Sequence, residues 1–186
     1  QFNPLLAKAG QGSPSNPVKL AEMKDPTGRN HAAFPYLNES TGQFYIIGGD
    51  ENFPWGVQAT KNKPSNPRGG YHFMNFTDPN NPREDAIYEV PEAGSHNLWV
   101  YGDILLAGNY QGGLRIVDIS GELLGDIYKQ GREIAHFLSY HKDGRIPNAP
   151  MVWGAQPYKD YIFFSDMNSG LYCVTYEDEQ KTASAQ

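Results

Sequence analysis

Short apolar blocks alternate with clusters of turn-forming residues along this chain of 186 residues. Two of the blocks, residues 104–109 and 161–166, are apolar enough to predict β-strands buried on both faces. The stretches that follow, residues 109–113 and 166–170, contain Asn, Asp, Ser and Gly, which tolerate the positive φ angles of tight turns. The pattern predicts β-hairpins, and helical periodicity of any length is missing.

The hairpins belong to a repeated unit. His96 precedes Gly113 by 17 positions, and Trp153 precedes Gly170 by the same 17. Two copies of the unit therefore align without a gap. An earlier copy begins at His31 and reaches its own glycine pair only after a longer stretch of chain.

In the earlier copy the apolar block lies at residues 44–50 and the second strand at residues 69–76. Residues 52–68 between them are rich in Pro, Asn and Lys, which predicts an insertion at a hairpin tip. Another short strand is expected upstream of each copy. These additional strands are predicted at residues 18–24, 86–90 and 125–129.

Each unit therefore supplies about four strands over roughly 40 to 60 residues, the period of a propeller blade. We predict an all-β fold in which residues 16–177 form β-propeller blades of four antiparallel strands. The length allows about three to four blades, and closed propellers generally need about four to eight, so we expect a partial or incompletely closed propeller. Residues 1–15 are expected to be irregular, and residues 178–186 to be a disordered tail.

One segment resembles a known family of repeats. Residues 114–118, Leu-Arg-Ile-Val-Asp, match four of the five positions of the LVIVD pattern, and His96 with the following Asn also resembles the repeat of the LVIVD-repeat β-propeller proteins. The third copy departs from this pattern with Trp153 in place of His, and the first copy has Tyr-His-Phe-Met-Asn at residues 71–75. The resemblance implies a propeller fold and an exported bacterial protein, periplasmic or extracellular, but no established reaction.

Charge and hydropathy narrow the choice of partners. The formal net charge of −6 argues against a nucleic-acid groove, because phosphate binding needs a clustered surplus of Lys and Arg. No apolar run approaches the length needed to cross a bilayer. The chain starts with Gln1, and uncovered sheet edges invite aggregation. We therefore expect its partners to be other protein subunits or the remainder of its own propeller.

The candidate chemistry rests on His31 and His96, which hold equivalent positions in their copies. Equivalent positions in a propeller point to the same central channel, where converging imidazoles bind copper, zinc or iron. The alternative is that each His bonds a neighbouring backbone carbonyl and fixes its loop. Sequence position alone does not separate a metal ligand from a hydrogen-bonded structural residue.

Other conspicuous residues have simpler explanations. Cys173, the only cysteine, is predicted to be a small core residue in a strand. His72 is expected on a strand face, and His136 and His141 in a loop without a metal role. Residues 166–170 superficially resemble a calcium loop but lack its distal acidic ligands, so a turn explains them.

The insertion carries the candidate anchors for a partner protein. Phe53 and Trp55 lie within it, and exposed aromatic residues are over-represented among interface hot spots. The alternative is that Trp55 folds back and pins its own loop. Trp99 and Trp153 lie in or beside expected core strands, where large aromatic side chains serve packing.

Two functions follow from these observations. The first is a non-catalytic, extracytoplasmic propeller that binds protein as a scaffold subunit of a larger assembly. It is favoured by the edge problem, by the polar insertion and by the lack of a nucleophile elbow, Walker loop or dinucleotide fingerprint. The second is a metal-dependent redox or hydrolytic enzyme with channel histidines, by analogy with the selenium-binding-protein propellers.

Overall fold

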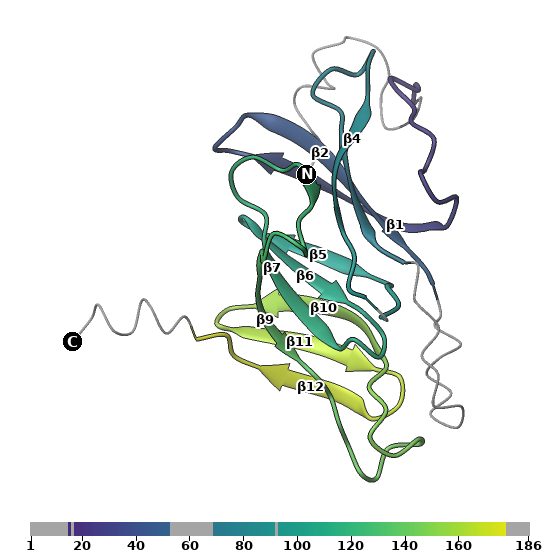
Figure 1. Ribbon diagram of the computed structural model, residues 1–186, viewed down its shortest axis with the longest axis vertical. Coiled ribbons are helices and arrows are strands. Elements are labelled where there is room, and N and C mark those ends of the chain that lie inside the picture. Colours follow the sequence, from purple (N-terminus) through teal and green to yellow (C-terminus); the bar gives the residue numbers. More distant parts are fainter. Residues whose placement is uncertain (1–14, 16, 53–68, 92, 178–186) are drawn as a thin grey trace, which may run out of the picture.

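The computed structural model describes residues 15, 17–52, 69–91 and 93–177. Within these residues the protein is all-β: twelve strands form three sheets, all pairs but one are antiparallel, and none of the sheets is closed. The sheets follow one another along the long axis of the molecule (Figure 1). The predicted all-β class is therefore confirmed.

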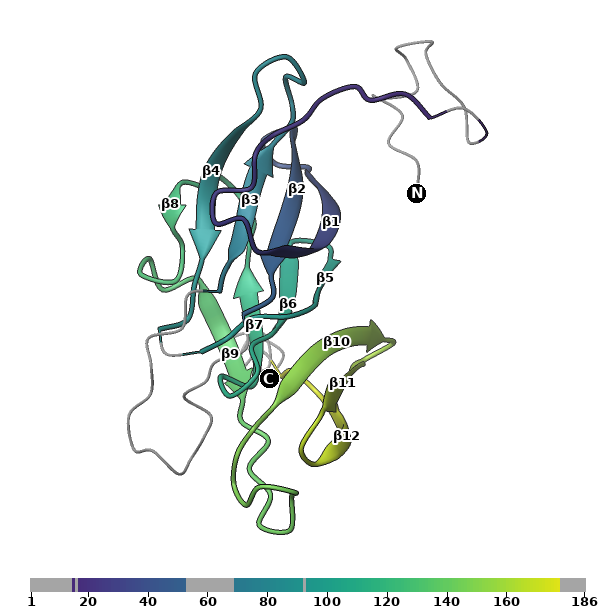
Figure 2. The same cartoon turned by 90° about the vertical axis from the view of Figure 1, so that its right-hand side faces the viewer.

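The first sheet contains the first repeat copy. Its order is β1 (Asn30–Asn38), β2 (Gln43–Asp50), β3 (Tyr71–Asn75) and β4 (Arg83–Tyr88). The short β8 (Gly125–Asp126) pairs in parallel with β4 and extends the sheet at its edge (Figure 2). The predicted hairpin across the insertion is confirmed, because β2 and β3 pair antiparallel.

The second sheet is assembled from the next copy. It runs in the order β5 (Leu98–Tyr101), β6 (Ile104–Gly108), β7 (Leu114–Asp118) and β9 (Glu133–Phe137). The turn between β6 and β7 needs glycine: Gly113 has φ 78°, and a Cβ there would collide with the carbonyl oxygen of Phe137 in β9.

The third sheet has three strands within the described chain. They are β10 (Val152–Tyr158), β11 (Tyr161–Asp166) and β12 (Gly170–Val174), in that order. The hairpin of β11 and β12 confirms the predicted turn at residues 166–170. Asp166 stabilises this turn, because its Oδ1 accepts hydrogen bonds from the backbone N–H groups of Asn168 and Ser169 at 2.7 and 3.0 Å.

Apolar side chains fill the space between successive sheets. One core cluster joins the first sheet to the second, and it includes Tyr45, Ile47 and Leu105. Another joins the second sheet to the third, and it includes Leu106 and Phe164. Because β6 contributes Leu105 to one cluster and Leu106 to the other, the middle sheet is buried on both faces.

Buried tyrosines of the first sheet hydrogen-bond to the second. Tyr36 donates to the Asp103 carboxylate at 2.7 Å, and Tyr71 donates to the Gly108 carbonyl at 2.7 Å. Tyr88 likewise donates to Glu133 at 2.6 Å. A buried hydroxyl costs free energy when it lacks a partner, so these bonds fix the orientation of one sheet on the other.

Three strand predictions are wrong in detail. Residues 18–24 form no strand, and of residues 125–129 only the two residues of β8 are extended. Residues 161–166 form β11, but this strand alternates between buried and exposed side chains. The reason is that the second sheet covers one face of β11, and within the described residues no sheet covers the other.

Two side-chain predictions are also corrected. Cys173 is exposed, because it points to the uncovered face of the third sheet, opposite Phe163 in the ladder. His136 lies in β9 and not in a loop. The charged residues around it hid this edge strand, which needs only one apolar face.

Some predictions lie outside the described residues. These are the irregular segment up to residue 14, the tail at residues 178–186, and the partner-binding side chains Phe53 and Trp55. Within the part of the chain that is described, no helix is long and apolar enough to cross a membrane.

Candidate functional site

The three equivalent positions at the start of the repeat copies form one row of rings. The His31 and His96 ring centroids are 4.4 Å apart, and those of His96 and Trp153 are 5.0 Å apart with nearly parallel planes. This row exists because the first strands of the three sheets lie side by side: β5 contacts β1 and also contacts β10. The structure thus brings together the two histidines that the sequence singled out.

Glu51 joins the two histidines from the end of β2. Its Oε2 lies 3.4 Å from Nδ1 of His31, and its Oε1 lies 3.8 Å from Nε2 of His96. One donor atom from each of the three side chains lies within 4.8 Å of the others. Glu51 was not among the residues expected from the sequence. The pairing of β1 with β2 explains its position, because this pairing places Glu51 beside the start of β1.

His96 is held in one tautomer. Its Nδ1 lies 3.1 Å from the carbonyl oxygen of Trp153, and because a carbonyl only accepts, Nδ1 carries the proton. Burial and the neighbouring His31 lower the pKa of His96 against the opposing charge of Glu51. Nε2 of the neutral ring therefore keeps its lone pair, and Oε1 of Glu51 lies 3.8 Å from it. The bond to a backbone carbonyl and a role as ligand are compatible, since they use different nitrogens.

Tyr110 positions the carboxylate of Glu51. Its hydroxyl donates to Oε1 of Glu51 at 3.1 Å, and its ring packs edge-on against His96 with centroids 5.5 Å apart. Burial and the Glu51 charge raise the pKa of Tyr110, so the phenol stays a hydrogen-bond donor. The residue is almost fully buried, and it ties the carboxylate to the turn after β6.

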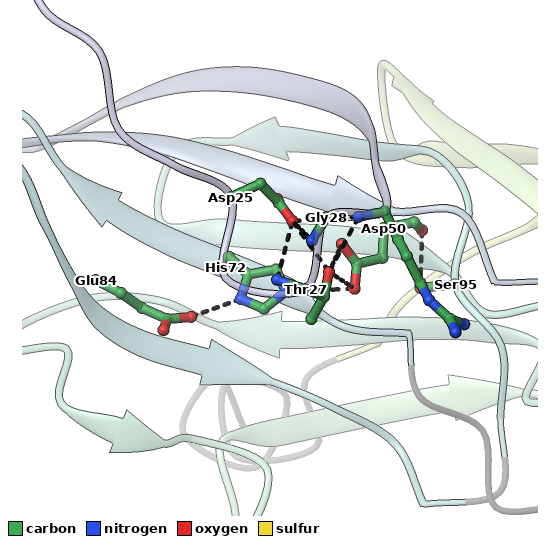
Figure 3. Close-up of polar contacts among 8 residues, drawn as sticks. Asp25, Thr27, Gly28, Asp50, His72, Glu84 and Ser95 are labelled. Atoms are coloured by element: carbon green, nitrogen blue, oxygen red, sulfur yellow. Dashed lines mark hydrogen bonds and ion pairs between the residues drawn. The ribbon is translucent and has the colours of Figure 1, made fainter.

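A second polar cluster is centred on His72 and Asp50 (Figure 3). The His72 ring is buried between Glu84, 2.5 Å from Nδ1, and Asp50, 3.4 Å from Nε2. Burial opposes the charged form, but the hydrogen bonds and charges of the two carboxylates outweigh it and raise the pKa of His72 to about 9. His72 is therefore an imidazolium at neutral pH. The sequence predicted only that His72 lies on a strand face and did not indicate this charge.

Asp50 links this cluster to the candidate site. Thr27 donates to its carboxylate at 2.8 Å, and Ser95 donates to its backbone carbonyl at 2.8 Å. Asp50 and Ser95 immediately precede Glu51 and His96, two of the three donors. The buried cluster thus fixes the backbone from which those side chains project.

The donor set defines the chemistry available. Two imidazoles and one carboxylate are the ligands of many catalytic zinc sites and of non-haem iron sites. The His31 side chain is 35% exposed and that of Glu51 is 45% exposed, so solvent reaches the donors. His136 pairs with Glu133 and His141 is exposed; the structure brings neither into the cluster.

A different surface lies on the uncovered face of the third sheet. Phe163 and Leu171 are 37% and 75% exposed. Together with Trp99 and Trp153 they line a groove of about 450 Å³. Large exposed apolar patches commonly mark interaction sites.

Comparisons with known proteins identify no relatives. No protein-family model and no curated protein matches the chain. Among solved structures, the crystal structure of the computationally designed Ika4 protein is similar with a TM-score of 0.41 and 10% sequence identity. The similarity covers 72% of this chain and 61% of the designed protein.

Proposed function

We propose that the chain is a three-blade portion of a β-propeller that acts as a protein-binding subunit, and that the outer face of β10–β12 is its docking surface. The propeller interpretation is supported by the repeated hairpins, by the contact between first strands and by the row of equivalent rings. Location outside the cytoplasm rests on the resemblance of residues 114–118 to the LVIVD repeat.

One observation carries the docking surface. Leu106 and Leu114 in the second sheet are 2% and 0% exposed because the third sheet covers them. Phe163 and Leu171 occupy the matching positions of the third copy and are 37% and 75% exposed. The same face is therefore apolar in both sheets, and among the described residues only the second sheet has a further sheet covering it.

The occupant is a further β-sheet of the same architecture. The covered face of the second sheet receives the aromatic and aliphatic side chains of β10 and β11, so a sheet with a similar apolar face fits its counterpart. Burying large apolar side chains is the main favourable term in such an association. The module then serves as a scaffold within a larger assembly and needs no catalytic group.

Self-association tests this surface, with the chain itself as the probe. Sedimentation velocity over a wide concentration range is expected to show association of the wild-type chain, and the variant carrying Phe163→Asp and Leu171→Asp is expected to remain monomeric. Leu124→Asp is the matched control, because Leu124 is 54% exposed on a different part of the molecule. A wild-type chain that stays monomeric and binds no anilinonaphthalene sulfonate would overturn the proposal.

A metal-dependent enzyme is the second candidate. The specific observation in its favour is the convergence of His31, Glu51 and His96, which supplies a donor set used in hydrolytic and redox sites. In this candidate function the chemistry would depend on a bound metal ion.

A further inference from the structure

The geometry points to a binding site for one divalent transition-metal ion of the zinc class, with His31, Glu51 and His96 as ligands and Tyr110 as a positioning residue. This inference rests on and deepens the second candidate function. None of the four residues belongs to β10–β12, although His96 contacts Trp153 of β10, and the two proposals are tested with different variants.

The spacing of the donor atoms fits such an ion. Zinc binds imidazole nitrogen and carboxylate oxygen at about 2.0–2.1 Å in a tetrahedral arrangement, which places neighbouring donors roughly 3.4 Å apart. Oε2 of Glu51 lies 3.4 Å from His31 and Oε1 lies 3.8 Å from His96, and one donor atom from each of the three side chains lies within 4.8 Å of the others. Small side-chain rotations of His31 and Glu51, which are 35% and 45% exposed, would bring the donors to the spacing of a bound ion.

His96 has the support that metal-binding histidines usually receive. A ligating imidazole commonly donates its other N–H to a carbonyl or carboxylate, which fixes the ring and raises its basicity. The bond from Nδ1 to the Trp153 carbonyl has this form. The ring is further held between His31 and Trp153, so its Nε2 is oriented before any ion arrives.

Glu51 has equivalent support from Tyr110. The hydroxyl bonds to one carboxylate oxygen at 3.1 Å, and a carboxylate oxygen has lone pairs for both a hydrogen bond and a metal. The backbone around Glu51 is also fixed, since Ser95 binds the Asp50 carbonyl and Asn52 bridges to Ser95. Two of the three ligands are thus oriented by separate contacts.

The ligand types select the ion. Calcium and magnesium prefer sites made wholly of oxygen donors, whereas imidazole suits zinc, copper, iron and nickel. Three protein ligands leave a fourth tetrahedral position for water, which is the arrangement of catalytic zinc sites. A metal ion bound here would also not be fully buried, because Glu51 and His31 are partly exposed to solvent.

Isothermal titration of metal-free protein with zinc chloride tests the site. We expect one zinc ion per chain in the wild type and an affinity reduced at least about 100-fold in Glu51→Gln and His31→Ala, since loss of an outer-sphere partner alone costs roughly 10- to 100-fold. Tyr110→Phe should lower affinity about 10-fold and leave the stoichiometry unchanged. Titration of the wild type with cobalt chloride should produce the intense visible bands of a tetrahedral complex. If Tyr110 positions Glu51, these bands should change in Tyr110→Phe; if Tyr110 only supports the fold, they should stay the same.

His141→Ala is the matched control, because it removes an exposed histidine outside the cluster and should leave zinc affinity unchanged. Circular dichroism and thermal unfolding confirm that each variant is folded; His31→Ala and Glu51→Gln were chosen because both side chains are partly exposed. Equal zinc binding by wild type and Glu51→Gln would overturn the site. Loss of the zinc site would not affect the proposed docking function. Stoichiometric zinc binding without hydrolytic or redox turnover would support the metal site and contradict the enzymatic function.

Discussion

The second and third sheets share one sequence pattern and differ in what surrounds them. Position 163 lies 57 residues after position 106, and position 171 lies 57 after position 114. The earlier member of each pair is buried and the later one is exposed. The repeat therefore encodes which face of a strand is apolar, and the neighbouring sheet decides whether that face is buried.

A second difference concerns the polar pairs between strands. In the first two sheets a cation on the third strand pairs with a carboxylate on the fourth: His72 with Glu84, and Arg115 with Glu133. The matching residue of the third sheet is Tyr172, and within the described residues that sheet has no fourth strand. The missing cation and the missing strand thus occur together.

The largest expected effect comes from truncating one leucine in each sheet. Leu114→Ala should lower the free energy of unfolding by about 3 kcal/mol, because it removes a fully buried side chain and leaves a cavity. Leu171→Ala should change it by less than about 0.5 kcal/mol. Urea unfolding followed by tryptophan fluorescence measures both, and similar losses in the two variants would break the comparison.

The buried His72 should make stability depend on alkaline pH. Its pKa of about 9 in the folded protein lies above the ordinary value of 6.5, so its contribution is complete below pH 6.5 and is lost as the pH rises to 9. The loss should be roughly 3 kcal/mol at most. Urea unfolding at a series of pH values measures it.

The control variant for this profile is His72→Gln, which should remove the pH-dependent part between 6.5 and 9. The equivalent pair in the second sheet should show no such profile, because arginine does not deprotonate in proteins. An unchanged profile in His72→Gln would mean that another group carries the titration.

The smallest expected effect is at Cys173, which matches the buried Ile116 of the second sheet. Cys173→Ser should alter the free energy of unfolding by less than about 0.5 kcal/mol. The native thiol should react with dithionitrobenzoate about as fast as it does in urea. Protection of the thiol at high protein concentration, relieved by Leu171→Asp, would show that the face is covered in an associated form.

The hairpins were predictable because their signals are local. Apolar blocks and glycines with positive φ, such as Gly113 and Gly170, occur within a few residues of one another. Strand β9 was missed because its pattern depends on lying at the edge of a sheet, with one face toward solvent. The candidate metal site was predictable in part: repeat alignment made His31 and His96 equivalent, but Glu51 belongs to no repeated motif.

By itself, the sequence determined the all-β class, the hairpins and the turns that close them, because these depend on neighbouring residues and on short apolar blocks. Only the tertiary structure decided that Glu51 meets His31 and His96, that His72 is charged between two carboxylates, and that Phe163 is exposed where Leu106 is not. The first and third outcomes depend on how separate sheets pack, and the second depends on the pairing of β3 with its neighbours in the first sheet. Their common physical cause is contact between residues far apart in the chain, which depends on the surroundings of a residue and not on its position in the repeat.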